Sequence, residues 1–195
     1  MKQKSSVRRA EPTFHVVHLL RHGQYTHATE DGGRTLTPLG KRQALTTARH
    51  LRRWPIERIW SSTLVRAIET ANIVGEALEV DPIRRSALLR EIVPSAVPGQ
   101  RVPLVTRREA RSAIDRILGE FLTPSRTTRH DLLVCHGNLI RALVCRVLAT
   151  GPAAWLSLAT SHCSLTTIVI ASDGKRQLVR YGENSYLPER LISTS

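Results

Sequence analysis

Two short apolar runs in this chain of 195 residues end in the same dipeptide, His-Gly, and this feature restricts the fold more than any other. Residues 15–20 lead to His22, and residues 132–135 lead to His136, each histidine being followed by glycine. Short apolar runs bounded by turn residues are typical of buried strands, and glycine lets the chain leave a strand for a loop. Both histidines are therefore expected at the carboxyl ends of strands.

The remaining hydrophobic periodicities alternate strands with helices along most of the chain. This alternation predicts an α/β fold, an open and mostly parallel sheet with helices on both faces. Thr37 and Asn138 are expected to cap the helices that follow them, and residues 172–175 to form a hairpin turn. The expected strands are 15–20, 56–61, 132–135, 165–171 and 177–181, the expected helices are 38–54, 64–78, 106–121 and 139–148, and residues 81–91 are expected to be extended.

The length predicts one domain, since two separate cores would leave each half near the lower size limit for stable domains. We assign residues 14–195 to this domain and residues 1–13 to a flexible, solvated basic arm. No apolar run approaches the ~18 residues of a membrane span, and a secretory signal is not recognised, so we expect no membrane contact and a cytoplasmic location. The three cysteines are expected to be reduced core residues.

The net charge of +13 favours phosphorylated or otherwise acidic partners, although a solvated basic surface explains it equally well. Nucleic acid is an unlikely partner, because the basic residues are scattered and are not interleaved with aromatic residues. The cysteine spacing contains no metal-binding pattern, so no metal is expected.

Parallel strands bring their carboxyl ends to one edge of the sheet, where α/β proteins bind ligands. If the two strands are neighbours, His22 and His136 converge there. Arg21 and Arg66 could donate forked hydrogen bonds to a phosphoryl group, and a protonated His136 could add a third donor. His22 could attack phosphorus, and Glu91 could protonate the leaving group if burial raised its pKa. From the residues alone, each of these side chains could equally be a packing or surface residue.

The blocks LLRHGQY, TLTPLGKRQA, IWSSTLVRAIETA, LLRE and LLVCHGNLIRALVC, in this order, resemble the histidine phosphatase superfamily, also called phosphoglycerate mutase-like. The resemblance runs from about Phe14 to beyond Ser164. It implies a phosphoglycerate mutase-like fold and a reaction that needs no metal or other cofactor. By this resemblance the catalytic residues are His22 as the phosphorylated nucleophile, Arg21 and Arg66 as phosphate ligands, His136 as the second pocket histidine and Glu91 as the proton donor, while Arg21, Arg66, His136, Gln24 and Gly137 contact the substrate.

Within the superfamily, the chain looks most like the mitochondrial serine/threonine protein phosphatase branch. It departs from that branch before Phe14, where neither a membrane helix nor a tryptophan-containing oligomerisation motif is recognised, so membrane anchoring and higher assembly are not carried over. A homodimer is expected from the family alone. The other six histidines match no catalytic block and are expected to be structural or surface residues; they are His15, His18, His27, His50, His130 and His162.

The sequence thus predicts a phosphomonoesterase that acts through a phosphohistidine on phosphoserine or phosphothreonine in proteins. Small phosphate esters and protein phosphohistidine are alternative substrates. A phosphate-binding or nucleic-acid-binding module without turnover is an alternative of another class. Arg101 in the proline-rich loop 92–105, with Arg107 and Arg108 flanking it, suggests an acidic or multiply phosphorylated target, either a protein or a small molecule.

Overall fold

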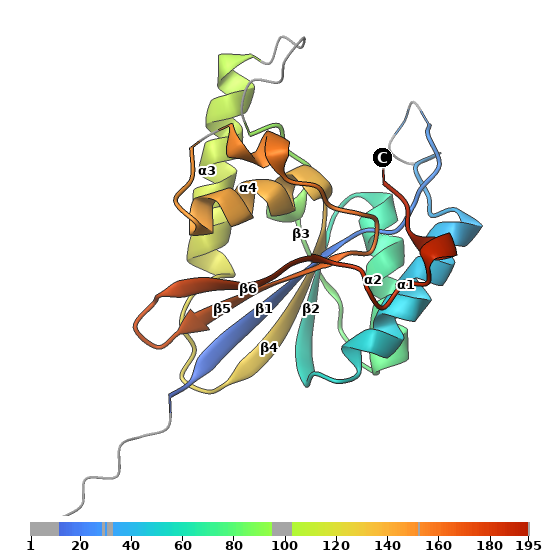
Figure 1. The fold of residues 1–195 in the computed structure, drawn as a ribbon, viewed down its shortest axis with the longest axis horizontal. Coiled ribbons are helices and arrows are strands. Elements are labelled where there is room, and N and C mark those ends of the chain that lie inside the picture. Colours follow the sequence, from blue (N-terminus) through green and yellow to red (C-terminus); the bar gives the residue numbers. More distant parts are fainter. Residues whose placement is uncertain (1–11, 29, 31–32, 95–102, 152, 195) are drawn as a thin grey trace, which may run out of the picture.

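A computed structural model describes residues 12–28, 30, 33–94, 103–151 and 153–194 of the chain (Figure 1). The basic arm expected at 1–13 lies almost entirely outside the described residues. So does the middle of the loop expected at 92–105, Arg101 included.

A six-stranded sheet with the order β3-β2-β4-β1-β5-β6 forms the centre of the fold. The pairs β1–β4, β4–β2 and β2–β3 are parallel, whereas β5 is antiparallel to both β1 and β6. The expectation of a mostly parallel sheet is therefore confirmed. The strands are β1 (Phe14–Arg21), β2 (Ile56–Ser62), β3 (Arg84–Ser86), β4 (Arg129–Cys135), β5 (Leu165–Ala171) and β6 (Arg176–Glu183).

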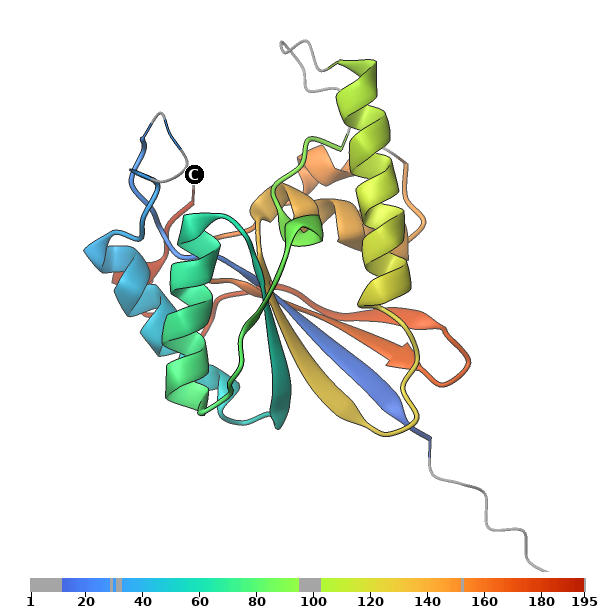
Figure 2. The ribbon, with the colours of Figure 1, turned by 180° about the vertical axis from the view of Figure 1, so that it is seen from behind.

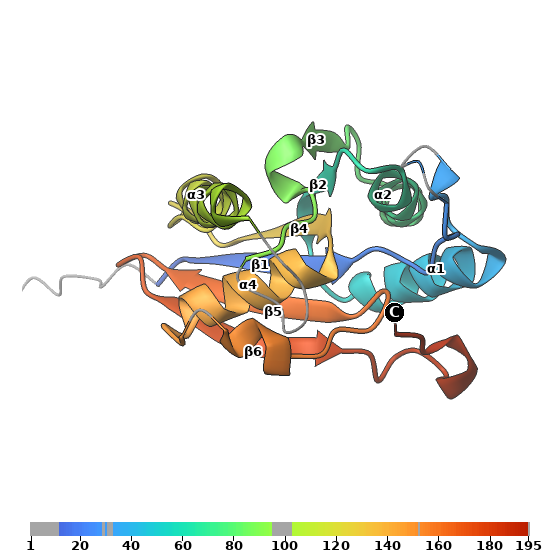
Figure 3. The same cartoon turned by 90° about the horizontal axis from the view of Figure 1, so that it is seen from above.

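Helices cover both faces of the sheet, as expected (Figures 1, 2 and 3). Helices α1 (Pro38–Leu51) and α2 (Val65–Leu78) pack on one face, and α3 (Leu104–Glu120) and α4 (Gly137–Val147) pack on the other. Alternate residues of a strand supply the two cores. On β1, for example, Leu19 belongs to the core under α3 and α4, and Leu20 to the core under α1 and α2.

Helix α1 begins as expected and ends earlier than expected. The side chain of Thr37 accepts a hydrogen bond from the backbone N–H of Gly40 at 3.0 Å, which caps the helix. The helix ends at Leu51, not at Trp54, because the N–H of Trp54 turns back to the carbonyl of Leu51 and Pro55 has no N–H to donate.

Helix α4 starts two residues earlier than expected. His136 has extended backbone angles and occupies the cap position, so the helix follows strand β4 directly, and Asn138 is not its cap. The side chain of Asn138 instead accepts a hydrogen bond from Arg141. The segment expected to be extended over residues 81–91 also differs, since a short 3-10 helix, Ala87–Leu89, follows β3.

Backbone contact between two glycines fixes the loop that follows β1. A Cβ atom on Gly23 would lie 2.7 Å from the carbonyl oxygen of Gly40, and one on Gly40 would lie 2.0 Å from the carbonyl oxygen of Gln24. Only residues without a side chain allow this approach. The loop that carries His22 is thereby held against the first turn of α1.

No helix in the described parts of the chain is long and apolar enough to cross a membrane. The three cysteines, Cys135, Cys145 and Cys163, are buried and free, in agreement with their expected place in the core.

Candidate active site

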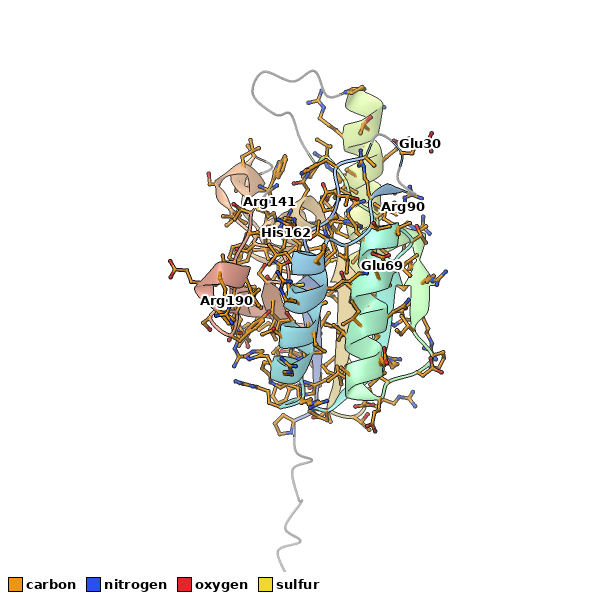
Figure 4. All side chains as sticks on the ribbon, turned by 90° about the vertical axis from the view of Figure 1, so that its right-hand side faces the viewer. Glu30, Glu69, Arg90, Arg141, His162 and Arg190 are labelled. Atoms are coloured by element: carbon orange, nitrogen blue, oxygen red, sulfur yellow. The ribbon has the colours of Figure 1, made fainter. Side chains whose placement is uncertain are left out.

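A cavity of about 380 Å³ opens at the carboxyl edge of the parallel strands. Strand β1 pairs with β4 so that Arg21 lies opposite Cys135, and this register brings His22 and His136 together as expected. Their ring centroids are 5.0 Å apart. Figure 4 shows Arg90, Arg141 and His162 at this same end of the molecule. The cavity is lined by Arg21, His22, Tyr25, Arg34, Arg66, Glu91, Gly137, Asn138, Arg141, Leu158, Ala159, Thr160 and Thr194.

The ring of His22 is held in one tautomer. Its Nδ1 lies 2.8 Å from the carbonyl oxygen of Gly23, and because a carbonyl only accepts, Nδ1 carries the proton. The other nitrogen, Nε2, accepts a hydrogen bond from Nε of Arg66 at 3.2 Å. The lone pair of a neutral imidazole is therefore on Nε2.

Burial lowers the pKa of His22 well below its usual range, and the neighbouring His136 and the two arginines lower it further. The hydrogen bond to Gly23 opposes this shift. The neutral, nucleophilic form of the ring is consequently the one present at physiological pH.

His136 is also neutral in this site, contrary to the protonated form considered from sequence. Burial lowers its pKa most, and the charges of Arg66 and Arg21 add to the effect. Its Nε2 lies 2.8 Å from the hydroxyl oxygen of Ser62. That oxygen also accepts the N–H of Leu64 at 3.2 Å, and it still has its hydroxyl proton to donate to Nε2. In the tautomer that accepts this proton, the ring proton of His136 is on Nδ1.

Nδ1 of His136 is buried and has no hydrogen-bond partner among the described residues. A buried donor without an acceptor is costly and is rare in native proteins. With its ring proton on Nδ1, a neutral His136 can donate one hydrogen bond to an anionic ligand.

The guanidinium group of Arg21 is buried and oriented by the segment between α4 and β5. It donates to the carbonyl oxygen of Thr160 at 2.5 Å and to Nε2 of His162 at 3.2 Å. Nδ1 of His162 contacts the hydroxyl of Ser193 at 3.0 Å. Burial lowers the pKa of His162 to about 4, so this ring is neutral and can accept from Arg21. His162, left outside the site by its sequence context, thus positions a site residue.

Arg66 lies in the first turn of α2, as expected, and is buried. Its guanidinium carbon is 4.8 Å from the centroid of the Tyr25 ring, which supports a cation–π contact. Thr70, one turn later, donates to the carbonyl of Arg66 at 2.7 Å and accepts the N–H of Gly23 at 3.0 Å. One threonine therefore connects the helix of Arg66 to the loop of His22.

Glu91 reaches the cavity from the segment after the 3-10 helix and binds the start of α4. Its Oε1 accepts the N–H of Leu139 at 3.2 Å and that of Ile92 at 3.2 Å. The surrounding protein raises the pKa of the Glu91 carboxyl by desolvation, and these backbone hydrogen bonds oppose the rise. Glu91 is nevertheless exposed to solvent, which moderates the rise of its pKa.

Comparison with known proteins identifies the family. A model described as histidine phosphatase superfamily (branch 1) matches residues 17–113 and 100–184. The chain belongs to the histidine phosphatase superfamily. The resemblance seen in the sequence motifs is thereby confirmed.

Two relatives of this histidine phosphatase carry the name serine/threonine-protein phosphatase Pgam5, mitochondrial. The protein from Caenorhabditis elegans is 35% identical over 91% of the chain, and the one from Mus musculus is 30% identical over 96%. The chain spans 66% and 68% of their respective lengths. Their names include the word mitochondrial, which contradicts the expected cytoplasmic location. We therefore correct that expectation: these relatives point to mitochondria.

The phosphoglycerate mutase of Plasmodium falciparum has a similar structure. The two structures align with a TM-score of 0.64 and 25% identity, covering 91% of this chain and 96% of the mutase. The phosphoglycerate mutase-like fold expected from the motifs is thus confirmed.

Two residues expected to contact the substrate of this histidine phosphatase have different surroundings. Gly137 lines the cavity. Gln24 does not: its side-chain oxygen accepts a hydrogen bond from the hydroxyl of Thr37 at 2.7 Å, and its N–H donates to Gln43 at 2.8 Å. Gln24 therefore joins the loop of His22 to α1.

The site contains further residues that were not predicted from the sequence, and of these Arg141 had a usable signal. It stands one helical turn after Gly137 on α4, so the two share a face directed at the cavity. Ser62, Thr70, Thr160 and His162 act through other residues, and nothing in their sequence context marks them.

Proposed function

We propose that this protein is a metal-independent phosphomonoesterase that transfers the phosphoryl group of its substrate to Nε2 of His22. One observation carries the proposal: Nδ1 of His22 donates to Gly23, so the nucleophilic lone pair is on Nε2, in a cavity lined by arginines. A phosphoryl group is the electrophile that suits this combination.

In the first step, Nε2 of His22 attacks phosphorus as the bond to the ester oxygen breaks. Arg21 and Arg66 donate to the equatorial oxygens, where negative charge must be stabilised. Nδ1 of His136 supplies a further donor, since it is buried and lacks an acceptor within the described structure. The proton of Glu91 passes to the leaving alkoxide oxygen, and its raised pKa favours the protonated form that this step requires.

In the second step, water attacks the phosphohistidine. The Glu91 carboxylate, now without its proton, accepts one from the attacking water as the N–P bond breaks. Inorganic phosphate leaves, the lone pair returns to Nε2, and the proton is again on Glu91. The hydrogen bond from Nδ1 to Gly23 is kept throughout, so the ring is ready for another cycle.

Phosphoserine and phosphothreonine in proteins are the substrates that we propose, and the names of the relatives support this choice. Small phosphate esters and protein phosphohistidine would undergo the same two steps. We also propose that residues 14–195 form one domain, and that this domain forms the homodimer expected from the family.

The test is hydrolysis of p-nitrophenyl phosphate and of a phosphothreonine peptide, with EDTA present, by the wild type and by His22→Ala. Hydrolysis by the wild type alone supports the proposal, and the ratio of the two rates ranks protein against small-molecule substrates. Hydrolysis that persists in His22→Ala would show that His22 is not the nucleophile. A wild type inactive on both substrates favours a narrow small-molecule specificity or a phosphate-binding module.

A further inference from the structure

The cavity carries more positive charge than one phosphoryl group neutralises. Among the residues that the structure describes, four arginines and one acidic residue line it. A phosphomonoester brings a charge of about −1.5 to −2 at neutral pH. Glu91 is uncharged when it acts as the acid, and neutral His22 and His136 add no charge. The bound substrate therefore leaves positive charge uncompensated.

Two of these arginines, Arg34 and Arg141, have no role in the phosphoryl-transfer steps. No carboxylate among the described residues forms an ion pair with either side chain. The like charge of Arg141 helps to lower the pKa of Arg21, which places the two guanidinium groups within electrostatic reach of each other. An anion bound near both would relieve this repulsion.

Arg141 is held in place by its surroundings. Its guanidinium group donates to the carbonyl oxygen of Leu158 at 3.2 Å and to the side chain of Asn138, and its carbon lies 4.8 Å from the centroid of the Trp155 ring. Its Nε is buried and has no hydrogen-bond partner among the described residues. A fixed guanidinium loses little side-chain entropy on binding an anion.

Arg34 approaches from the loop between β1 and α1. Its Nε donates to the carbonyl oxygen of Ala28 at 2.9 Å, so this arginine is also anchored, and it is half-buried. Arg34 and Arg141 thus line one cavity from different elements, in addition to Arg21 and Arg66. Its volume of about 380 Å³ is within the range of roughly 300–1,000 Å³ that is usual for small-ligand sites.

We propose that Arg34 and Arg141 form a second anion subsite, which binds a carboxylate or phosphate carried by the same substrate as the scissile phosphoryl group. The proposal rests on the proposed function and specifies its substrate class. Two sources fit this chemistry: an acidic residue beside a phosphoserine or phosphothreonine, and the carboxylate of a small phosphate ester.

The test is calorimetric binding to the full-length His22→Ala protein, which needs no turnover. One ligand pair is a phosphothreonine peptide flanked by Asp and Glu and the same peptide with Asn and Gln. The other pair is phosphoserine and phosphoethanolamine, which lacks the carboxylate. We expect the acidic member of at least one pair to bind about 10-fold more tightly. The pair that shows the difference identifies the source of the anion.

Arg141→Gln and Arg34→Gln, each added to His22→Ala, are expected to remove most of this preference. Arg146→Gln is the matched control, because Arg146 lies on the same helix and does not line the cavity. It removes the same charge and is expected to keep the preference. Arg34→Gln gives an independent reading if Arg141→Gln fails to fold.

Equal binding of the acidic and neutral members of both pairs overturns the subsite. An equal loss of preference in Arg146→Gln also overturns it, since the effect would then come from overall charge. Failure of the proposed function can be distinguished from failure of the subsite. It would appear as a wild type that hydrolyses neither test substrate, and it does not depend on the affinities measured with His22→Ala.

Discussion

Nε of Arg66 lies 3.2 Å from Nε2 of His22 and donates a hydrogen bond to it. Without substrate, the arginine thus occupies the lone pair that attacks phosphorus in the proposed mechanism. A phosphoryl oxygen offers Arg66 a charged acceptor in place of the neutral imidazole, and charged acceptors form the stronger hydrogen bonds. Substrate binding would therefore release the nucleophile and orient the electrophile in one exchange.

Glu91 should control the alkaline limb of the pH profile. Its pKa is raised, and its protonated form is needed for the leaving group, so turnover of a phosphothreonine peptide should fall as pH rises through that pKa. Glu91→Gln should remove this limb and slow the peptide about 100-fold. It should slow p-nitrophenyl phosphate much less, because that leaving group needs little protonation. Equal slowing of both substrates in steady-state assays would exclude Glu91 as the acid.

His162 should act as a positioning residue through Arg21. His162→Ala removes the acceptor at 3.2 Å from Arg21 and should lower kcat/KM about 10- to 100-fold. His162→Gln should recover part of this loss, since an amide can both accept from Arg21 and donate to Ser193. The pKa of about 4 further predicts that the pH profile has no step due to this ring near pH 6.5. If His162 had only a structural role, a His162 variant with the Tm of the wild type would also have the kcat/KM of the wild type.

Gly40→Ala should destabilise the protein, because its Cβ would lie 2.0 Å from the carbonyl oxygen of Gln24. Backbone at both ends of this contact must shift, and we expect a loss of about 1–3 kcal/mol in the free energy of unfolding. Gly119→Ala is the matched control. Gly119 lies in α3, where an added Cβ meets nothing within 4 Å, so alanine should stabilise that helix by up to about 1 kcal/mol. Urea unfolding measures the free energy of unfolding of both variants. The prediction fails if the two substitutions change it by the same amount.

Asp131 should make stability depend on pH at the amino-terminal edge of the sheet. Its carboxylate contacts His15 at 2.7 Å and Arg58 at 2.5 Å, with Arg129 at 3.6 Å. Although burial opposes the shift, these hydrogen bonds and charges lower the pKa of Asp131 to about 2, from a usual value of about 4.

The resulting stabilisation is present above pH 4 and is lost as the pH falls through about 2. Asp131→Asn should cost about 2 kcal/mol in the free energy of unfolding at pH 7, and this cost should shrink below pH 4. Asp115→Asn removes a carboxylate from an exposed pair with Arg146 and should cost under about 1 kcal/mol. A cost for Asp131→Asn that does not change with pH would contradict the assignment.

The positions of His22 and His136 could be predicted from sequence, because an apolar run followed by glycine marks a strand end and parallel neighbours share an edge. The chemistry of phosphoryl transfer made Arg21, Arg66 and Glu91 candidates, and the family motifs then assigned their roles. These residues are identified by local sequence patterns.

The surroundings of Gln24 and His162 could not be predicted in this way. Gln24 turns toward Thr37 because two distant glycines bring the loop of His22 onto α1. His162 reaches Arg21 through a contact between positions 141 residues apart in the chain. Such contacts depend on long-range packing, which the periodicity of one segment does not contain.

The most direct test of the central proposal is isolation of the phosphoenzyme under alkaline conditions. The wild type is mixed with a labelled phosphothreonine peptide in EDTA, denatured rapidly in alkali to protect an N–P bond, and mapped by peptide mass spectrometry. We predict label on His22 of the wild type and no label in His22→Ala. Turnover of the peptide with the label on another residue, or undiminished turnover by His22→Ala, would contradict the mechanism.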